Sequence, residues 1–288
     1  KIMNTALEYL RQNRLPHIWC PGCGHGTITG AVVRAIARLN LDRNKVVIVS
    51  GIGCSSRAPG YMDFDTLHTT HGRALAFATG IKHARPDLKV IVMTGDGDAT
   101  AIGGNHFIHA ARRNIDITTI VMNNNIYGMT SGQVSPMTPK GALGTTAPYG
   151  NIDRSFDLVN LATAAGATYV GRATTYHVPL LIDLIEKAIQ HNGFSVIEAM
   201  TPCPTYFGRK NKMGGAVELL NMLKDNAVNI KAASALSEDK LKGKFLIGEF
   251  VNKDEPEFTS EYINMVHQVQ RKFDTFQGGL RECAQNSD

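Results

Sequence analysis

The sequence predicts an α/β fold with a doubly wound parallel sheet, and three observations indicate this. Several short apolar runs end in glycine-rich or polar segments, which is typical of buried parallel strands that lead into loops. Amphipathic helical patterns lie between these runs, as expected for right-handed crossovers in a layered α/β domain. The composition of the 288 residues, 43% hydrophobic and 19% charged, is that of a folded chain with a sizeable core.

The elements alternate along the first two thirds of the chain. Strands are expected at 45–51, 89–95, 117–123, 168–170 and 194–200, and helices at 27–39, 72–83, 104–113 and 178–191. Residues 128–150 are rich in Pro, Gly and Thr, and they form too long a connection for an ordinary turn. This segment is therefore interpreted as a functional loop.

The domain organisation follows from a change in polarity near residue 205. Residues 1–205 are expected to form one domain that contains the functional site. Residues 206–288 are more polar, with a helical pattern at 217–224 and an apolar run at 245–247. They are interpreted as a C-terminal extension packed on the same domain.

Composition and charge exclude several classes of protein. The formal charge is +5, but the densest basic groups, 209–212 and 240–244, are short and lack interleaved aromatic residues, so no nucleic-acid partner is expected. A basic face that meets an acidic protein partner is compatible with this charge. No apolar run approaches the roughly 18 residues that cross a membrane, and the N-terminal segment lacks the apolar core of a secretory signal. A cytoplasmic protein with no membrane partner is expected.

Two polar segments follow neighbouring strands and point to a magnesium-diphosphate site. Gly95-Asp96-Gly97-Asp98 ends the second strand, and the run that begins at Asn123 follows 28 positions after Gly95. Glycines allow the backbone to approach a diphosphate, and Mg²⁺ prefers oxygen ligands. The pattern resembles the diphosphate-binding motif of thiamine-diphosphate enzymes. This resemblance implies Mg²⁺ ligands at Asp96, Asn124 and the Ile126 carbonyl, and a cofactor lining of Gly97, Asp98, Gly128 and Met129.

Four of the five cysteines occupy positions suited to a metal centre. Cys20 and Cys23 form a CxxC, Cys54 follows the first strand, and Cys203 follows the last predicted strand. Four thiolates from three loops can surround Zn²⁺ or a [4Fe–4S] cluster, and the spacing does not choose between them. Cys283 has no accompanying motif and is left outside this set.

The motifs together are similar to one family, the β subunits of the 2-oxoacid:ferredoxin oxidoreductases. The resemblance spans about residues 17–212 and rests on CPGCGHG, GIGCSSR, LHTTHGRALAFATGIK, GDGDATAIGGNHFIHAARRN, NNNIYGMTSGQVSPMTP and CPTYFGRKNK. It implies that the four cysteines hold one [4Fe–4S] cluster and that Arg57 contacts coenzyme A. It also places Ile52, Gly53, Cys54, Ser55 and His71 against thiamine diphosphate. Ser131 occupies a position where some relatives carry lysine.

The resemblance implies oxidative decarboxylation of a 2-oxoacid to its acyl-CoA, with electrons passed through the cluster to ferredoxin, or the reverse carboxylation. The CPTYFGRKNK segment favours 2-oxoglutarate and hence succinyl-CoA, and pyruvate or another 2-oxoacid remains an alternative. A non-redox thiamine-dependent decarboxylase or carboligase would not need the cysteines, and an electron carrier would not need GDGD.

The size of the chain bears on its partners. A thiamine enzyme needs one domain for the diphosphate and a second for the aminopyrimidine, and this chain has room for only one of them. It is therefore expected to be inactive alone. No catalytic residue is assigned on it. The missing domain is expected on an α subunit, in an α2β2 assembly.

Overall fold

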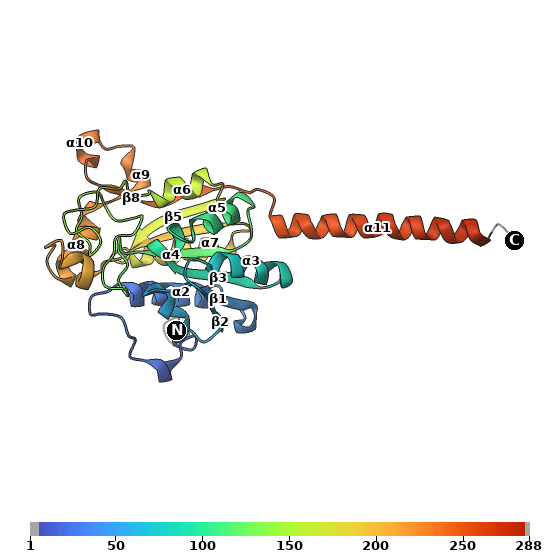
Figure 1. The fold of residues 1–288 in the computed structure, drawn as a ribbon, viewed down its shortest axis with the longest axis horizontal. Coiled ribbons are helices and arrows are strands. Elements are labelled where there is room, and N and C mark those ends of the chain that lie inside the picture. The colour runs from blue at the N-terminus through green and yellow to red at the C-terminus, as the bar shows by residue number, and fades with distance from the viewer. Residues whose placement is uncertain (1–5, 286–288) are drawn as a thin grey trace.

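The computed structural model describes residues 6–285, with side chains described as far as residue 273. Its centre is an eight-stranded sheet between two layers of helices (Figure 1). The sheet order is β2-β1-β3-β4-β6-β5-β8-β7. The strands are β1 (Val46–Ser50), β2 (Asp65–His68), β3 (Lys89–Gly95), β4 (Thr118–Asn123), β5 (Tyr169–Thr174), β6 (Ser195–Met200), β7 (Ala227–Asn229) and β8 (Phe245–Asn252).

The helices differ widely in length. They are α2 (His25–Arg38), α3 (Ala74–Ala84), α4 (Asp96–Thr100), α5 (Gly104–Arg112), α6 (Leu158–Ala164), α7 (Val178–Gln190), α8 (Ala216–Asn226), α9 (Ile230–Ala233), α10 (Glu238–Leu241) and α11 (Phe258–Gln285). Short turns of helix at η1 (Gln12–Arg14), η2 (Arg43–Lys45), η3 (Ser55–Tyr61) and η4 (Pro204–Gly208) complete the described elements.

The predicted doubly wound parallel sheet is confirmed for its first six strands. All pairs among β1 to β6 are parallel, whereas β8 runs antiparallel to β5 and brings β7 to the far edge. The strands β1, β3, β4 and β6 are adjacent, so their carboxyl ends lie in a row at one edge. Loops that follow such a row are where open α/β sheets bind ligands.

Two hydrophobic layers cover the sheet because its strands alternate between the two faces. On one face, Ile48, Ile120 and Ile197 pack with α2 and α7. On the other face, Val49, Val121 and Val196 pack with α3, α5 and α6. These strands are almost fully buried, which explains their continuous apolar runs.

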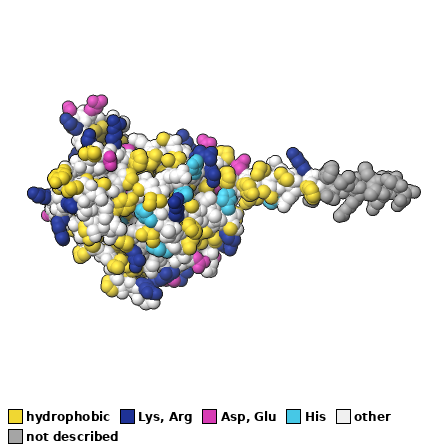
Figure 2. All heavy atoms as spheres, in the orientation of Figure 1, with side chains coloured by type: hydrophobic (Ala, Val, Ile, Leu, Met, Phe, Trp, Pro, Cys, Tyr) yellow, Lys and Arg dark blue, Asp and Glu magenta, His cyan; other side chains and the backbone are white. Residues whose placement is uncertain are grey.

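The C-terminal part of the chain has two distinct structures. β8 is paired with β5 and so extends the sheet, while α11 projects from the body (Figure 1). Apolar side chains are visible along the described part of α11 (Figure 2). The exposed large apolar residues of this helix include Tyr262, Met265, Val269 and Phe273. The division of the chain at residue 205 stays a prediction. Within the described residues, no helix combines the length and the apolar character needed to cross a membrane.

Candidate cofactor and metal site

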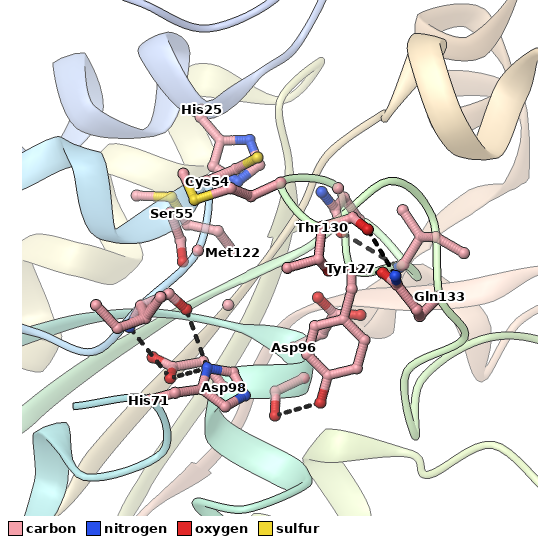
Figure 3. A pocket seen from close by; sticks show the side chains of 18 residues that line it. His25, Cys54, Ser55, His71, Asp96, Asp98, Met122, Tyr127, Thr130 and Gln133 are labelled. Atoms are coloured by element: carbon pink, nitrogen blue, oxygen red, sulfur yellow. Dashed lines mark hydrogen bonds and ion pairs between the residues drawn. The ribbon is translucent and has the colours of Figure 1, made fainter. Parts of the chain in front are cut away.

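A cavity of about 450 Å³ opens at the carboxyl ends of β1, β3 and β4. Figure 3 shows His25 and Cys54 at one end of it and Asp98 and His71 at the other. All the residues expected to contact the cofactor or Mg²⁺ line this cavity, namely Ile52, Gly53, Cys54, Ser55, His71, Asp96, Gly97, Asp98, Asn124, Ile126, Gly128 and Met129. The structure therefore brings segments from four loops together around one space.

Asp96 lies at the start of α4 and is buried, with 3% of its surface exposed. Burial raises the pKa of its carboxyl to about 7. The Ser135 hydroxyl opposes this rise by donating a hydrogen bond to Oδ2. Ser135 comes from the loop that was interpreted as functional, but it was not singled out in the sequence. A divalent cation at this carboxylate would favour its charged form.

Asp98 is fully engaged by protein donors. Its Oδ1 accepts the backbone N–H of Gly72 at 2.6 Å and lies 2.9 Å from Nδ1 of His71. Its Oδ2 accepts the Thr94 hydroxyl at 2.7 Å. A Cβ on Gly51 would lie 2.1 Å from Oδ2, so only glycine fits there. Asp98 thus fixes the loops after β1 and β2 against the end of β3.

The first two asparagines of the run at 123–125 have different side-chain partners. Asn123 is buried, donates from Nδ2 to Oε1 of Glu198 at 2.7 Å, and accepts the Asn125 N–H at 3.0 Å. Asn124 accepts the Ile126 N–H at 3.3 Å and lines the cavity. Asn125 adopts a left-handed conformation with φ +62°, which asparagine tolerates. The first asparagine therefore supports the turn, and the second faces the cavity.

Two glycines bring the backbone close to its neighbours. A Cβ on Gly97 would lie 2.3 Å from the Tyr127 ring, whose hydroxyl donates to the Gly97 carbonyl at 3.1 Å. A Cβ on Gly128 would lie 3.3 Å from Sγ of Cys54 and 3.8 Å from Sγ of Cys203. The absence of side chains at these positions leaves the cavity open for a ligand.

A second cavity, of about 170 Å³, is lined by all four cysteines of the predicted metal centre. Cys203 is buried, Cys23 and Cys54 are half-buried, and Cys20 is exposed. Burial and the neighbouring thiols raise the pKa of Cys23 to about 12 and that of Cys54 to about 11. In the described part of the chain, no three His, Cys, Asp or Glu side chains are placed to hold a single metal ion. The four cysteines thus lie around one space.

The two cavities are neighbours, since Cys54, Asn124, Gly128 and Met129 line both of them. His25 lines the larger cavity and lies with Nδ1 2.9 Å from Sγ of Cys23. Burial lowers the pKa of His25 to about 4, so its imidazole is neutral at pH 7. A group bound by the thiols would be adjacent to a group bound in the larger cavity.

Arg57 and Ser131 do not line the cavity of about 450 Å³ that contains the expected cofactor residues. Arg57 lines the cysteine cavity and a third cavity of about 460 Å³, which it shares with Arg11, Arg14 and His68. Ser131 is exposed with φ +84° and lines neither the larger nor the cysteine cavity.

Sequence reasoning missed several lining residues. They are His25, Gly95, Met122, Tyr127, Thr130 and Gln133. His25 and Tyr127 lie inside the motifs CPGCGHG and NNNIYGM, so their positions in those motifs were the available signal.

Comparison with known proteins gives consistent results. The family model described as "Thiamine pyrophosphate enzyme, C-terminal TPP binding domain" matches residues 51–199. A 2-oxoglutarate synthase subunit KorB from Methanocaldococcus jannaschii is 54% identical over 267 residues, which are 93% of this chain and 99% of that protein. The subunit of the same name from Methanothermobacter thermautotrophicus is 50% identical over 280 residues, 97% of this chain and 98% of that protein.

A solved structure extends the similarity to the fold. It is the 2-oxoglutarate:ferredoxin oxidoreductase from Magnetococcus marinus with 2-oxoglutarate, coenzyme A and succinyl-CoA bound. The TM-score is 0.83 at 34% sequence identity, and the match covers 92% of this chain and 91% of that chain.

Proposed function

This chain belongs to the family of β subunits of the thiamine-dependent 2-oxoglutarate:ferredoxin oxidoreductases, and from that premise we propose its reaction, cofactors and partners. The reaction is the oxidative decarboxylation of 2-oxoglutarate to succinyl-CoA with electrons delivered to ferredoxin, or the reverse carboxylation. The observation that carries this proposal is that four thiols and a magnesium-diphosphate motif line adjoining cavities. The high identity to 2-oxoglutarate synthase subunits favours 2-oxoglutarate over pyruvate and other 2-oxoacids.

The cavity of about 450 Å³ at the carboxyl ends of β1, β3 and β4, hereafter the thiamine cavity, fits thiamine diphosphate with Mg²⁺. Its glycines leave room for a diphosphate against the backbone. Burial raises the pKa of the Asp96 carboxyl to about 7, and a bound cation would favour its charged form at neutral pH. Asp96, Asn124 and the Ile126 carbonyl would hold Mg²⁺. Ile52, Gly53, Cys54, Ser55, His71, Gly97, Asp98, Gly128 and Met129 would contact the organic cofactor.

The cysteine cavity fits a [4Fe–4S] cluster held by Cys20, Cys23, Cys54 and Cys203. Four thiolates can hold either a zinc ion or a [4Fe–4S] cluster. The cluster is favoured because the four thiols line a cavity of about 170 Å³ that adjoins the cavity proposed for thiamine, whose oxidative chemistry needs an electron acceptor. When bound, thiamine diphosphate supplies the nucleophilic carbon for decarboxylation, and the cluster supplies a one-electron acceptor beside it.

Arg57 would contact coenzyme A through its phosphate groups. The cavity that it shares with Arg11 and Arg14 contains no carboxylate, and a guanidinium binds phosphate with two parallel hydrogen bonds. This group of guanidinium side chains around one cavity supports a phosphorylated ligand.

An α subunit would supply the pyrimidine-binding domain and cover the thiamine cavity in an α2β2 assembly. Ile52 and Met129 line this cavity and are 39% and 47% exposed, which leaves apolar surface for a partner.

A reconstitution experiment tests the proposal. The β chain and its α subunit, purified separately without oxygen, are assayed for ferredoxin reduction that depends on 2-oxoglutarate and coenzyme A. Activity is expected only when both are mixed. Full activity of the β chain alone would contradict the need for an α subunit. Decarboxylation without ferredoxin reduction would favour a non-redox thiamine enzyme.

A further inference from the structure

The three segments that carry the four cysteines contain no acidic residue. Residues 9–41, 43–62 and 199–217 have neither Asp nor Glu, although the whole chain has 25 of them in 288 residues. The same segments contain Arg and Lys. Any surface that these segments form together is therefore positively charged or neutral.

One end of the cysteine cavity reaches the protein surface. Cys20 is exposed, and Ile18, which lines the same cavity, is 66% exposed. At the other end, Cys54 faces the thiamine cavity. A cluster held by the four thiols would therefore adjoin the thiamine cavity at Cys54 and come nearest to the surface at Cys20.

The two elements that flank a basic segment pack against the CxxC loop. A Cβ on Gly22 would lie 2.2 Å from Cβ of Ala216 and 3.4 Å from Cγ of Pro204, so the CxxC loop packs between η4 and the start of α8. Residues 209–212 form the first part of the connection between these two elements, which spans residues 209–215. Arg209 and Lys212 in this connection are exposed, and neither forms an ion pair in the part of the chain that the structure describes.

The nearest acidic residue in the sequence does not neutralise this charge by pairing with it. Glu218 accepts the backbone N–H of Gly215 at 2.8 Å at the start of α8. Among the residues that the structure describes, no carboxylate pairs with Arg209 or Lys212, and both side chains can contact a negatively charged partner.

We propose that the rim formed by Ile18, the Cys20–Gly22 loop, Arg209 and Lys212 is the docking surface for an acidic electron-carrier protein. The proposal rests on the proposed function, because it requires a redox cluster at the four thiols. Oxidation of one 2-oxoacid to its acyl-CoA releases two electrons, and two one-electron carriers are reduced in succession at this rim. Complementary charge at such a rim mainly accelerates encounter, and salt screens it.

The test uses the assembled αβ enzyme with the double variant Arg209→Glu/Lys212→Glu and a matched control, Lys240→Glu/Lys242→Glu. The control changes two exposed lysines in the polar C-terminal region. Initial rates are measured with an acidic ferredoxin over a range of ionic strength, and with methyl viologen as a small acceptor. The neutral variant Arg209→Gln/Lys212→Gln provides an intermediate charge.

The charge-reversed rim is expected to raise the KM for ferredoxin about tenfold at low salt and to remove most of its salt dependence. The neutral variant should fall between it and the wild type. The methyl viologen rate and the control should stay within about twofold of wild type. An unchanged KM for ferredoxin, or an equal loss with both acceptors, would overturn the docking surface. If the wild type reduced neither acceptor, the proposed function itself would fail.

Discussion

Glu198 on β6 accepts a hydrogen bond of 2.7 Å from the side-chain amide of Asn123 at the end of β4. The second carboxylate oxygen of Glu198 accepts Nε of Arg172 on β5 at 2.6 Å, and Nη2 of Arg172 reaches Asp157 at 2.7 Å. Glu198, Asn123 and Arg172 are each at most 8% exposed. A buried ion pair on two strands is thus connected to the loop that carries the proposed Mg²⁺ ligand Asn124.

Removal of the arginine should destabilise the fold. Arg172→Met leaves Glu198 without its cation in a buried position, which costs about 3–5 kcal/mol. Urea unfolding followed by circular dichroism should show this loss. The control is Arg34→Met, because Arg34 is exposed and its guanidinium donates to the backbone carbonyl of Gly30 in its own helix. Equal stability of the two variants would show that the pair does not stabilise the sheet.

The contact between Ser135 and Asp96 should influence the affinity for Mg²⁺. Ser135→Ala removes the hydroxyl that orients the Asp96 carboxylate, and loss of such a supporting contact typically weakens metal binding 10–100-fold. Asp96→Asn removes the ligand itself and should have the larger effect. Calorimetric titration of the apoenzyme with Mg²⁺ and thiamine diphosphate measures both. Wild-type affinity in Asp96→Asn would exclude Asp96 as a ligand.

Cys20 offers a test of the cluster that does not disturb the core. Its side chain is exposed, so Cys20→Ala removes a thiol without creating a buried cavity. The anaerobically purified variant should lose most of its iron because one of four cluster ligands is missing. Cys283→Ser is the control, since no motif accompanies Cys283 in the sequence. Unchanged iron content in Cys20→Ala would remove this residue from the ligand set.

Glu257 should make the start of α11 sensitive to pH. Burial alone would raise the pKa of its carboxyl, but the N–H groups of Thr259, Ser260 and Asp116 outweigh this and lower it. The stabilisation is therefore present above the unfolded-state pKa and is lost as the pH falls through the lower folded-state value.

Glu257→Gln should cost about 1 kcal/mol at pH 7, and the difference from wild type should shrink in acid. Hydrogen exchange of the first-turn amides of α11 measures this, with the exposed Glu255→Gln as control. A difference that grows in acid would show that the carboxylate does not stabilise this helix start.

The long buried strands could be predicted from the sequence, because an apolar run such as 89–95 is covered on both faces by helices. β2 was missed since it is a short edge strand with the mostly exposed sequence Asp65–His68. The antiparallel β8 was seen only as an apolar run, because its pairing with β5 is set by contacts distant in sequence.

In the site, too, residues that follow a strand directly could be predicted, whereas residues that act through distant contacts could not. Asp96 and Asn124 follow strands directly, so the sheet order brings them together. Ser135 and Glu198 act through contacts 39 and 75 residues away in the chain. No local pattern marks such contacts.

Metal analysis of the anaerobically purified αβ enzyme is the sharpest test of the proposed [4Fe–4S] cluster beside the thiamine cavity. About four irons per β chain are expected, with a visible absorption that bleaches when 2-oxoglutarate and coenzyme A are added. Zinc without iron would contradict the proposed cluster, because the cysteines would then have a structural role and the thiamine site no electron acceptor beside it.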